Sequence, residues 1–264
     1  MTGLDFTNKE NYNFDDLIEI MKYLRAPNGC PWDRVQTHES IRSNFIEETY
    51  EVIEAIDNKD SELLKEELGD VLLQVVFHSE MSAEENEFDI NDVINGVCKK
   101  LVERHPHVFG DVKADNSEEA LKSWDNVKMA KKSQKKQSEA MDSVSKALPS
   151  LMRAEKIQKK AAKVGFDWED VNGALDKVCE ETDELKEAVT SGNTDSQAEE
   201  LGDLLFSVVN VSRFIKVDSE KALYDACDKF TDRFKKLEIL AEERDIDIKT
   251  ASLSQLDSLW EEVK

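Results

Sequence analysis

The segments EETYE (47–51) and ELGD (67–70) decide the fold, because the chain repeats them as EETDE (180–184) and ELGD (200–203). Each acidic residue in the first copy is followed, 133 positions later, by an acidic residue in the second. Over the window 47–70, 11 of 24 positions are identical at this offset without a gap. A Glu-rich chain contains one such pattern by chance, whereas two copies in register indicate tandem duplication of one domain.

The first copy is predicted to be a pair of antiparallel helices joined by a short polar turn near Lys59. Folding about this midpoint places Glu51 opposite Glu67 and Glu48 opposite Asp70. Within each helix, acids that are three residues apart share a face. Four carboxylates are therefore expected to converge between the two helices.

The second copy repeats this arrangement about Gly192. The same folding places Glu184 opposite Glu200 and Glu181 opposite Asp203. A second group of four converging carboxylates is therefore expected in the second half of the chain.

Part of each acidic group is predicted to be buried, because Glu48 fills a gap in an apolar stripe of its helix and Glu181 does the same in its own. The stripes consist of Ile41, Phe45, Val52 and Ala55 in the first copy, and Ala174, Val178, Leu185 and Ala188 in the second. A carboxylate in an apolar stripe is costly unless it is paired, and converging carboxylates repel one another. A hard divalent cation relieves both costs, and oxygen-only ligands favour Mg²⁺, with Mn²⁺ as a substitute, over zinc. The alternative is that these acids only solvate helix faces.

The composition predicts an all-α protein. Only 9 Gly and 4 Pro occur among 264 residues, and no segment shows sustained period-two alternation. Helices are expected over 14–26, 39–57, 61–86, 90–105, 117–137, 149–164, 168–190, 195–215, 219–244 and 253–263, with Asp89 and Asp218 as N-caps. We expect two tandem four-helix-type modules, 1–125 and 146–264, which complete their cores as a homodimer.

The segment 126–145 is predicted to be a Lys-rich linker between the modules. Its basic residues are Lys128, Lys131, Lys132, Lys135 and Lys136. Few apolar residues accompany them, which favours a solvated segment over one that contacts a ligand or partner.

Charge and cysteine usage narrow the class of protein. The formal net charge of −23 disfavours binding to nucleic acid or to anionic membranes. The four cysteines are far apart, the N-terminus has no signal-like segment, and the longest apolar run, 71–77, is too short to span a membrane. A cytoplasmic protein with reduced thiols is expected.

Taken together, the motifs resemble the MazG family of nucleoside triphosphate pyrophosphohydrolases in its full-length form with two modules. The resemblance covers nearly the whole chain and rests on the spacing E-E-x-x-E, 15 residues, E-x-x-D, which related all-α dUTPase-like hydrolases share. The further matches are GCPWD (29–33), QT (36–37), RHPHVF (104–109), KIQK (156–159) and VGFDW (164–168).

This resemblance implies magnesium-dependent hydrolysis of nucleoside triphosphates between the α and β phosphates, with release of pyrophosphate. It implies metal ligands in both modules: Glu48, Glu51, Glu67 and Asp70, and Glu181, Glu184, Glu200 and Asp203. Glu47 and Glu180 become candidates to orient or deprotonate the attacking water.

The resemblance also implies nucleotide contacts from Lys177, Glu180 and Glu181, from Lys229 and Arg233, and from Trp260 near the base. Lys229 and Arg233 are four residues apart on one predicted helix, so both can reach one polyphosphate. Without the resemblance, these cations could be a surface pair and Trp260 a core residue. Lys100 and Arg104 form a related pair displaced by 129 positions, so the modules differ after the acidic hairpin.

We expect the second module to be the main catalytic site, because it alone has a tryptophan, Trp260, at the place that the resemblance implies, and its phosphate-binding cations lie nearer the pattern of the family. A broad specificity for nucleoside triphosphates is expected. The alternatives are a narrow dUTPase-like or dCTPase-like hydrolase, and a regulatory or scaffold protein that binds nucleotide without hydrolysing it. His105 and His107 flank Pro106 without companion ligands at metal spacing, and a structural role is expected for them.

Overall fold

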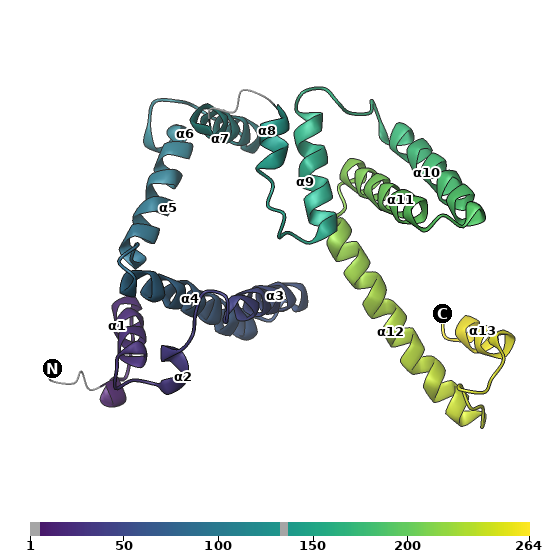
Figure 1. Cartoon of the computed structure of the whole chain (residues 1–264), viewed down its shortest axis with the longest axis horizontal. Helices are drawn as coiled ribbons and strands as arrows, with labels where there is room; N and C mark the ends of the chain where they lie inside the picture. Colours follow the sequence, from purple (N-terminus) through teal and green to yellow (C-terminus); the bar gives the residue numbers. More distant parts are fainter. Residues whose placement is uncertain (1–5, 133–136) are drawn as a thin grey trace. The chain divides into compact units, whose positions relative to one another are not determined.

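The computed structural model describes residues 6–132 and 137–264, and these residues form helices and no strand (Figure 1). The expected all-α class is therefore confirmed. The chain divides into two compact units, Met1–Lys131 and Lys132–Lys264. Residues 133–136, which include Lys135 and Lys136, lie outside the described residues, and the linker role of 126–145 stays a prediction.

The described part of unit 1 contains five helices of 12 or more residues and two of four residues. Its elements are a 3-10 turn at Phe6–Asn8, α1 (Phe14–Arg25), α2 (Pro31–Arg34), α3 (Arg42–Asn58), α4 (Ser61–Glu84), α5 (Ile90–Arg104), α6 (Pro106–Phe109) and α7 (Ser117–Lys132). The spacing of apolar residues did not predict α2 and α6, because four residues are too few to show a helical period. Both begin at a proline, whose fixed φ suits the first turn of a helix.

The described part of unit 2 contains four helices of 13 or more residues, with a shorter helix before them and another after them. Its elements are α8 (Gln137–Asp142), α9 (Ser150–Ala162), α10 (Val171–Ser191), α11 (Thr194–Ile215), α12 (Ser219–Glu243) and α13 (Leu253–Glu262). The short helix α8 was not expected as a separate element. The expected start of α10 at residue 168 is three residues early, because the side chain of Asp170 caps the helix through the amide of Asn172.

Both acidic hairpins turn where the sequence predicted. Helix α3 ends at Lys59 with φ of 57°, and α10 ends at Gly192 with φ of 73°. This left-handed conformation is free for glycine but costly for a residue with a Cβ atom. In each hairpin the next residue caps the following helix, Asp60 for α4 and Asn193 for α11. The predicted caps of α5 and α12, Asp89 and Asp218, are confirmed as well.

In each unit, the side chain of an arginine holds a connecting segment next to the acidic hairpin. In unit 1, Arg25 has a buried side chain that donates to both carboxylate oxygens of Glu84 at 2.7 and 2.8 Å and to the carbonyl of Asp33 at 2.5 Å. In unit 2, Arg213 pairs with Asp167. These fork-shaped contacts hold the irregular segments next to the hairpins against α4 and α11.

Each unit has its own small core. In unit 1, buried side chains from α1, α4, the start of α5 and the segment before α3 meet: Met21, Ile41, Val76, Phe77, Met81 and Ile90. In unit 2, a separate core joins α13 to the C-terminal half of α12 (Figure 1), through Leu237, Ala241 and Leu259. The C-terminal half of α4 thus belongs to the first core, whereas the acidic residues of both hairpins lie outside these cores.

The two hairpins are open on their outer sides. Among the helices of the described chain, α3 contacts only α4, and α10 contacts only α11. Apolar residues at helical spacing remain exposed on both hairpins: Ile46, Tyr50 and Ile53 on α3, and Leu201, Leu205 and Val208 on α11. One chain therefore leaves an apolar face uncovered in each unit.

Candidate metal and nucleotide sites

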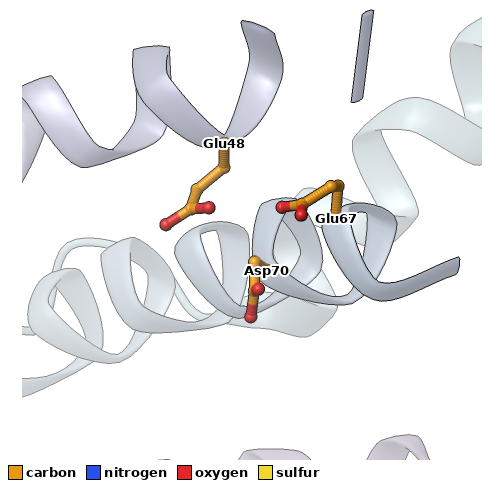
Figure 2. A group of neighbouring side chains, drawn as sticks. All are labelled: Glu48, Glu67 and Asp70. Carbon is orange, nitrogen blue, oxygen red and sulfur yellow. The ribbon is translucent and has the colours of Figure 1, made fainter. Parts of the chain in front are cut away.

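The first acidic hairpin brings three predicted ligands together. Glu48 on α3 and Glu67 and Asp70 on α4 each offer a carboxylate oxygen, and these oxygens lie within 4.8 Å of one another (Figure 2). Glu67 is only 8% exposed, and Glu48 and Asp70 are half-buried. The fourth predicted ligand, Glu51, lies beside both glutamates and interacts with their carboxylates. The carboxylates that the spacing places opposite one another therefore lie close together in the structure.

The electrostatics of this cluster favour a bound cation. Burial raises the pKa of Glu48, and the charge of Asp70 raises it further. Burial also raises the pKa of Glu67, with added repulsion from Glu51. Both effects destabilise the ionised carboxylates, and a positive charge among them would reverse this.

The second acidic hairpin forms a similar cluster from a slightly different set. Oxygens of Glu181, Glu184 and Glu200 lie within 4.8 Å of one another. Burial followed by repulsion from Glu181 raises the pKa of both Glu184 and Glu200, and the neighbouring Asp203 adds to the effect on Glu200. Asp203 itself is exposed and is not part of the closest group.

A lysine enters the second cluster and has no counterpart in the first. Lys177 Nζ lies 2.6 Å from a carboxylate oxygen of Glu181 and 2.9 Å from one of Glu180. These bonds raise the pKa of Lys177, with Glu181 as the larger cause. The position that corresponds to Lys177 at the offset of 133 is Asn44. The second module therefore supplies part of its own counter-charge.

The donors of both clusters suit a hard divalent cation. Every candidate ligand is a carboxylate oxygen, which is the donor type that Mg²⁺ prefers. Glu181 is 5% exposed, and its Oε2 atom is buried without a hydrogen-bond partner among the described residues. An unpaired anionic oxygen in such a place is costly unless a cation binds it.

The two residues predicted to handle the attacking water are next to a ligand in sequence but are themselves exposed. Glu47 precedes Glu48 on α3, and Glu180 precedes Glu181 on α10. Glu180 already faces a partner, Lys177. Their catalytic roles stay predictions.

The remaining predicted nucleotide contacts gather at α12 and α13. The guanidinium carbon of Arg233 lies 5.8 Å from the ring centroid of Trp260, and Phe230 packs against the same ring with centroids 5.1 Å apart. Trp260 is half-buried against the α12–α13 core, so one part of the ring packs and another remains accessible. Lys229 is exposed on α12.

Within the described chain, these two groups of predicted nucleotide contacts stay apart. Helix α13 contacts α12 alone, and α12 contacts α9, α11 and α13 but not α10. Lys177, Glu180 and Glu181 on α10 therefore form one group, and Lys229, Arg233 and Trp260 form another.

The constant offset of 133 positions between the two copies does not identify Trp124 as the counterpart of Trp260. The ring of Trp124 lies 5.2 Å from the guanidinium carbon of Arg104, which repeats the pairing of Arg233 with Trp260. The signal was the shared pattern W-x-x-V-K at 124–128 and 260–264, whose offset is 136 and not 133.

The fold and the clusters define an all-α protein with two carboxylate-only cation sites on duplicated helical hairpins. The MazG nucleotide pyrophosphohydrolase domain matches residues 36–109 and 169–238, one match on each hairpin. The nucleoside triphosphate pyrophosphohydrolase/pyrophosphatase MazG of Thermotoga maritima is 47% identical over 251 residues, which is 95% of either chain. The nucleoside triphosphate pyrophosphohydrolase of Escherichia coli K12 is 44% identical over 253 residues, 95% of this chain and 96% of its own.

The chain therefore belongs to the MazG family. It is an enzyme of the nucleoside triphosphate pyrophosphohydrolase class, which confirms the activity that the motifs implied. Among the described helices, none combines the length and the apolar character that crossing a bilayer requires.

Proposed function

We propose that this enzyme depends on Mg²⁺, cleaves a broad range of nucleoside triphosphates between the α and β phosphates, and uses the second module as its main site. The observation that carries the proposal is the buried, unpaired Oε2 of Glu181 inside a cluster of carboxylates. Glu181, Glu184 and Glu200, with Asp203 beside them, would hold the ion. Bound Mg²⁺ would supply charge neutralisation at the phosphate oxygens and acidify a bound water.

The residues around this cluster have complementary tasks in the proposal. Lys177 holds Glu180 and Glu181 in place through charged hydrogen bonds at 2.9 and 2.6 Å. Glu180 would accept a proton from the attacking water, because its carboxylate is exposed next to the buried ligand.

A second group would bind the rest of the nucleotide. Lys229 and Arg233 lie one turn apart on α12, so both can bind one polyphosphate, and Arg233 can do so through two parallel hydrogen bonds. The exposed part of the Trp260 ring would stack on the base.

We propose a homodimer as the working form. Its support is the open apolar face on each hairpin, which a second copy with the same face can cover. Light scattering during size-exclusion chromatography should give twice the chain mass, and Ile53→Lys on the exposed face of α3 should shift it toward the monomer. A monomer at micromolar concentration would contradict this part of the proposal.

A cytoplasmic location is also part of the proposal. All four cysteines have free thiols: Cys30, Cys98, Cys179 and Cys227. Free thiols of this kind suit a reducing compartment. The charge of −23 disfavours a nucleic acid as the binding partner and does not argue against a nucleotide that arrives with Mg²⁺.

Pyrophosphate release tests the central claim. Wild-type protein should release pyrophosphate from several ribonucleoside and deoxyribonucleoside triphosphates with Mg²⁺ and lose this activity in EDTA. Activity confined to dUTP or dCTP would replace the broad specificity with a narrow one. Orthophosphate in place of pyrophosphate would show that another bond is cleaved, and nucleotide binding without product would indicate a sensor or scaffold.

A further inference from the structure

The Arg–Trp pair of the second module has a structural equivalent in the first. Arg104 ends α5 and lies 5.2 Å from the ring of Trp124 on α7, whereas Arg233 lies 5.8 Å from the ring of Trp260. The duplication therefore extends past the acidic hairpin to a half-buried cation over an aromatic ring. That combination can hold a planar ring with an attached anion.

Next to Trp124 the first module has an open cavity of about 350 Å³. It is lined by His105, His107, Ala120, Leu121 and Trp124. The His105 ring meets the indole edge-to-face, with centroids 4.7 Å apart, and lies 5.5 Å from the His107 ring. Aromatic and aliphatic walls with a few polar groups are typical of small-molecule sites of this size.

The walls of this cavity are almost wholly apolar, and the two histidines beside it have unused hydrogen-bonding capacity. His105 Nδ1 lies 2.7 Å from the carbonyl oxygen of Leu101, and toward a carbonyl this nitrogen can only donate. In the neutral imidazole, Nε2 is then an acceptor. His107 Nδ1 is buried and has no hydrogen-bond partner among the described residues. A ligand that bonds to it would remove the cost of this unpaired nitrogen.

The surroundings of Trp260 are chemically different. Its ring neighbour is Phe230, which in turn stacks with Phe234, and no histidine occurs in the second half of the chain. The described aromatic neighbours of Trp260 are therefore phenylalanines, whereas the first module places imidazole nitrogens beside its tryptophan. These nitrogens can bond to the edge of a base.

We propose that the first module carries its own nucleobase pocket, in which Trp124 stacks on the base, His105 and His107 bond to the base edge, and Arg104 contacts the phosphates. The choice of a nucleobase rests on the proposed function, since nucleoside triphosphates are the planar, anionic ligands of this enzyme. The pocket replaces the structural role that the sequence suggested for both histidines. The chain then has two base sites with different selectivity.

Calorimetric titration of the full-length protein with the α,β-methylene analogues of ATP, GTP, CTP and UTP tests this pocket. Two sites per chain are expected in the wild type, of which Trp124→Leu removes one and Trp260→Leu, the matched control, removes the other. Wild-type protein with one site that survives Trp124→Leu would overturn the proposal. Thermal unfolding of each variant shows whether it is folded.

The milder variants His107→Gln and His105→Phe separate base reading from packing. Measured in the Trp260→Leu background, each should change the ratio of affinities between the four analogues at least fivefold. Unchanged affinity ratios would contradict hydrogen bonding of the histidines to the base edge, because a loss of packing alone would weaken the binding of all four analogues equally. Since the analogues are not cleaved, binding at Trp124 in a protein that releases no pyrophosphate would refute the proposed function and keep the pocket.

Discussion

The two acidic hairpins share their carboxylates and differ in what balances them. In the second, Lys177 binds Glu181 at 2.6 Å, whereas the first has Asn44 at the corresponding position. In both, burial and mutual repulsion raise carboxylate pKa values. Duplication therefore kept the group that can hold a cation, and the modules diverged in the residue that neutralises it in the metal-free state.

The largest expected effect tests whether this divergence makes one module dominant. Glu181→Gln should lower pyrophosphate release on the order of a thousandfold, equivalent to ~4 kcal/mol of barrier, because it removes a buried anionic ligand. The matched variant Glu48→Gln should cost much less. Steady-state rates of both variants at saturating Mg²⁺ give the comparison. An equal loss from either change would refute the asymmetry and indicate a site shared between modules.

The next effect concerns the anchoring of each tryptophan helix. Leu259 is 1% exposed in the α12–α13 core, whereas the residue before Trp124 is Ser123. Leu259→Ala should cost about 3 kcal/mol in the free energy of unfolding of unit 2, through lost burial and a cavity. Ser123→Ala, the control, should be nearly neutral. Urea denaturation measures both, and a neutral Leu259→Ala would contradict the assigned core.

A smaller effect tests the lysine itself. Lys177→Asn copies the first module into the second and should lower the unfolding temperature in EDTA by a few degrees, because Glu181 stays buried without its cation. Added Mg²⁺ should stabilise this variant more than the wild type, since the lysine and the ion compete for the same carboxylate.

The reverse exchange, Asn44→Lys, provides the control for this prediction. It should reduce the stabilisation of unit 1 by Mg²⁺. Equal responses to Mg²⁺ in both exchanges and in the wild type would show that Lys177 does not compete with the ion. Differential scanning calorimetry with and without Mg²⁺ measures all three proteins.

The smallest effect is a pH dependence specific to the first module. His78 stacks on His38 with Nδ1 atoms 2.6 Å apart, and burial followed by the charge of His38 lowers the pKa of His78. His78 therefore takes up a proton more readily in the unfolded chain than in the folded chain. Its contribution to the free energy of unfolding is present above about pH 6.5 and is lost as the pH falls through the lowered pKa. The second module has Val211 at the corresponding position.

The variant His78→Val, which copies the second module, should therefore reduce the loss of stability between pH 7 and pH 5. Unfolding midpoints of wild type and variant at each pH measure this difference, in which titrating groups that do not contact His78 cancel. Parallel pH profiles would show that His78 does not contribute.

Much of the site could be predicted from the sequence, because it depends on the spacing of residues within single helices. Acids three residues apart share a helix face, and equal distances from Lys59 and Gly192 set Glu48 against Asp70 and Glu184 against Glu200. Trp124 was not readable in the same way. Its partner Arg104 comes from another helix, and the insertion between Arg and Trp differs between modules, so no single offset aligns both.

The sequence by itself determined the helical class, the duplication, the turns of both hairpins and the residues that cap the next helices, because each depends on contacts within a few residues. Only the tertiary structure decided which carboxylate is buried deepest, that Arg104 lies over Trp124, and that the paired histidines 38 and 78 meet. Those features depend on how separate helices pack, and the packing sets burial and distance between residues that local periodicity does not relate.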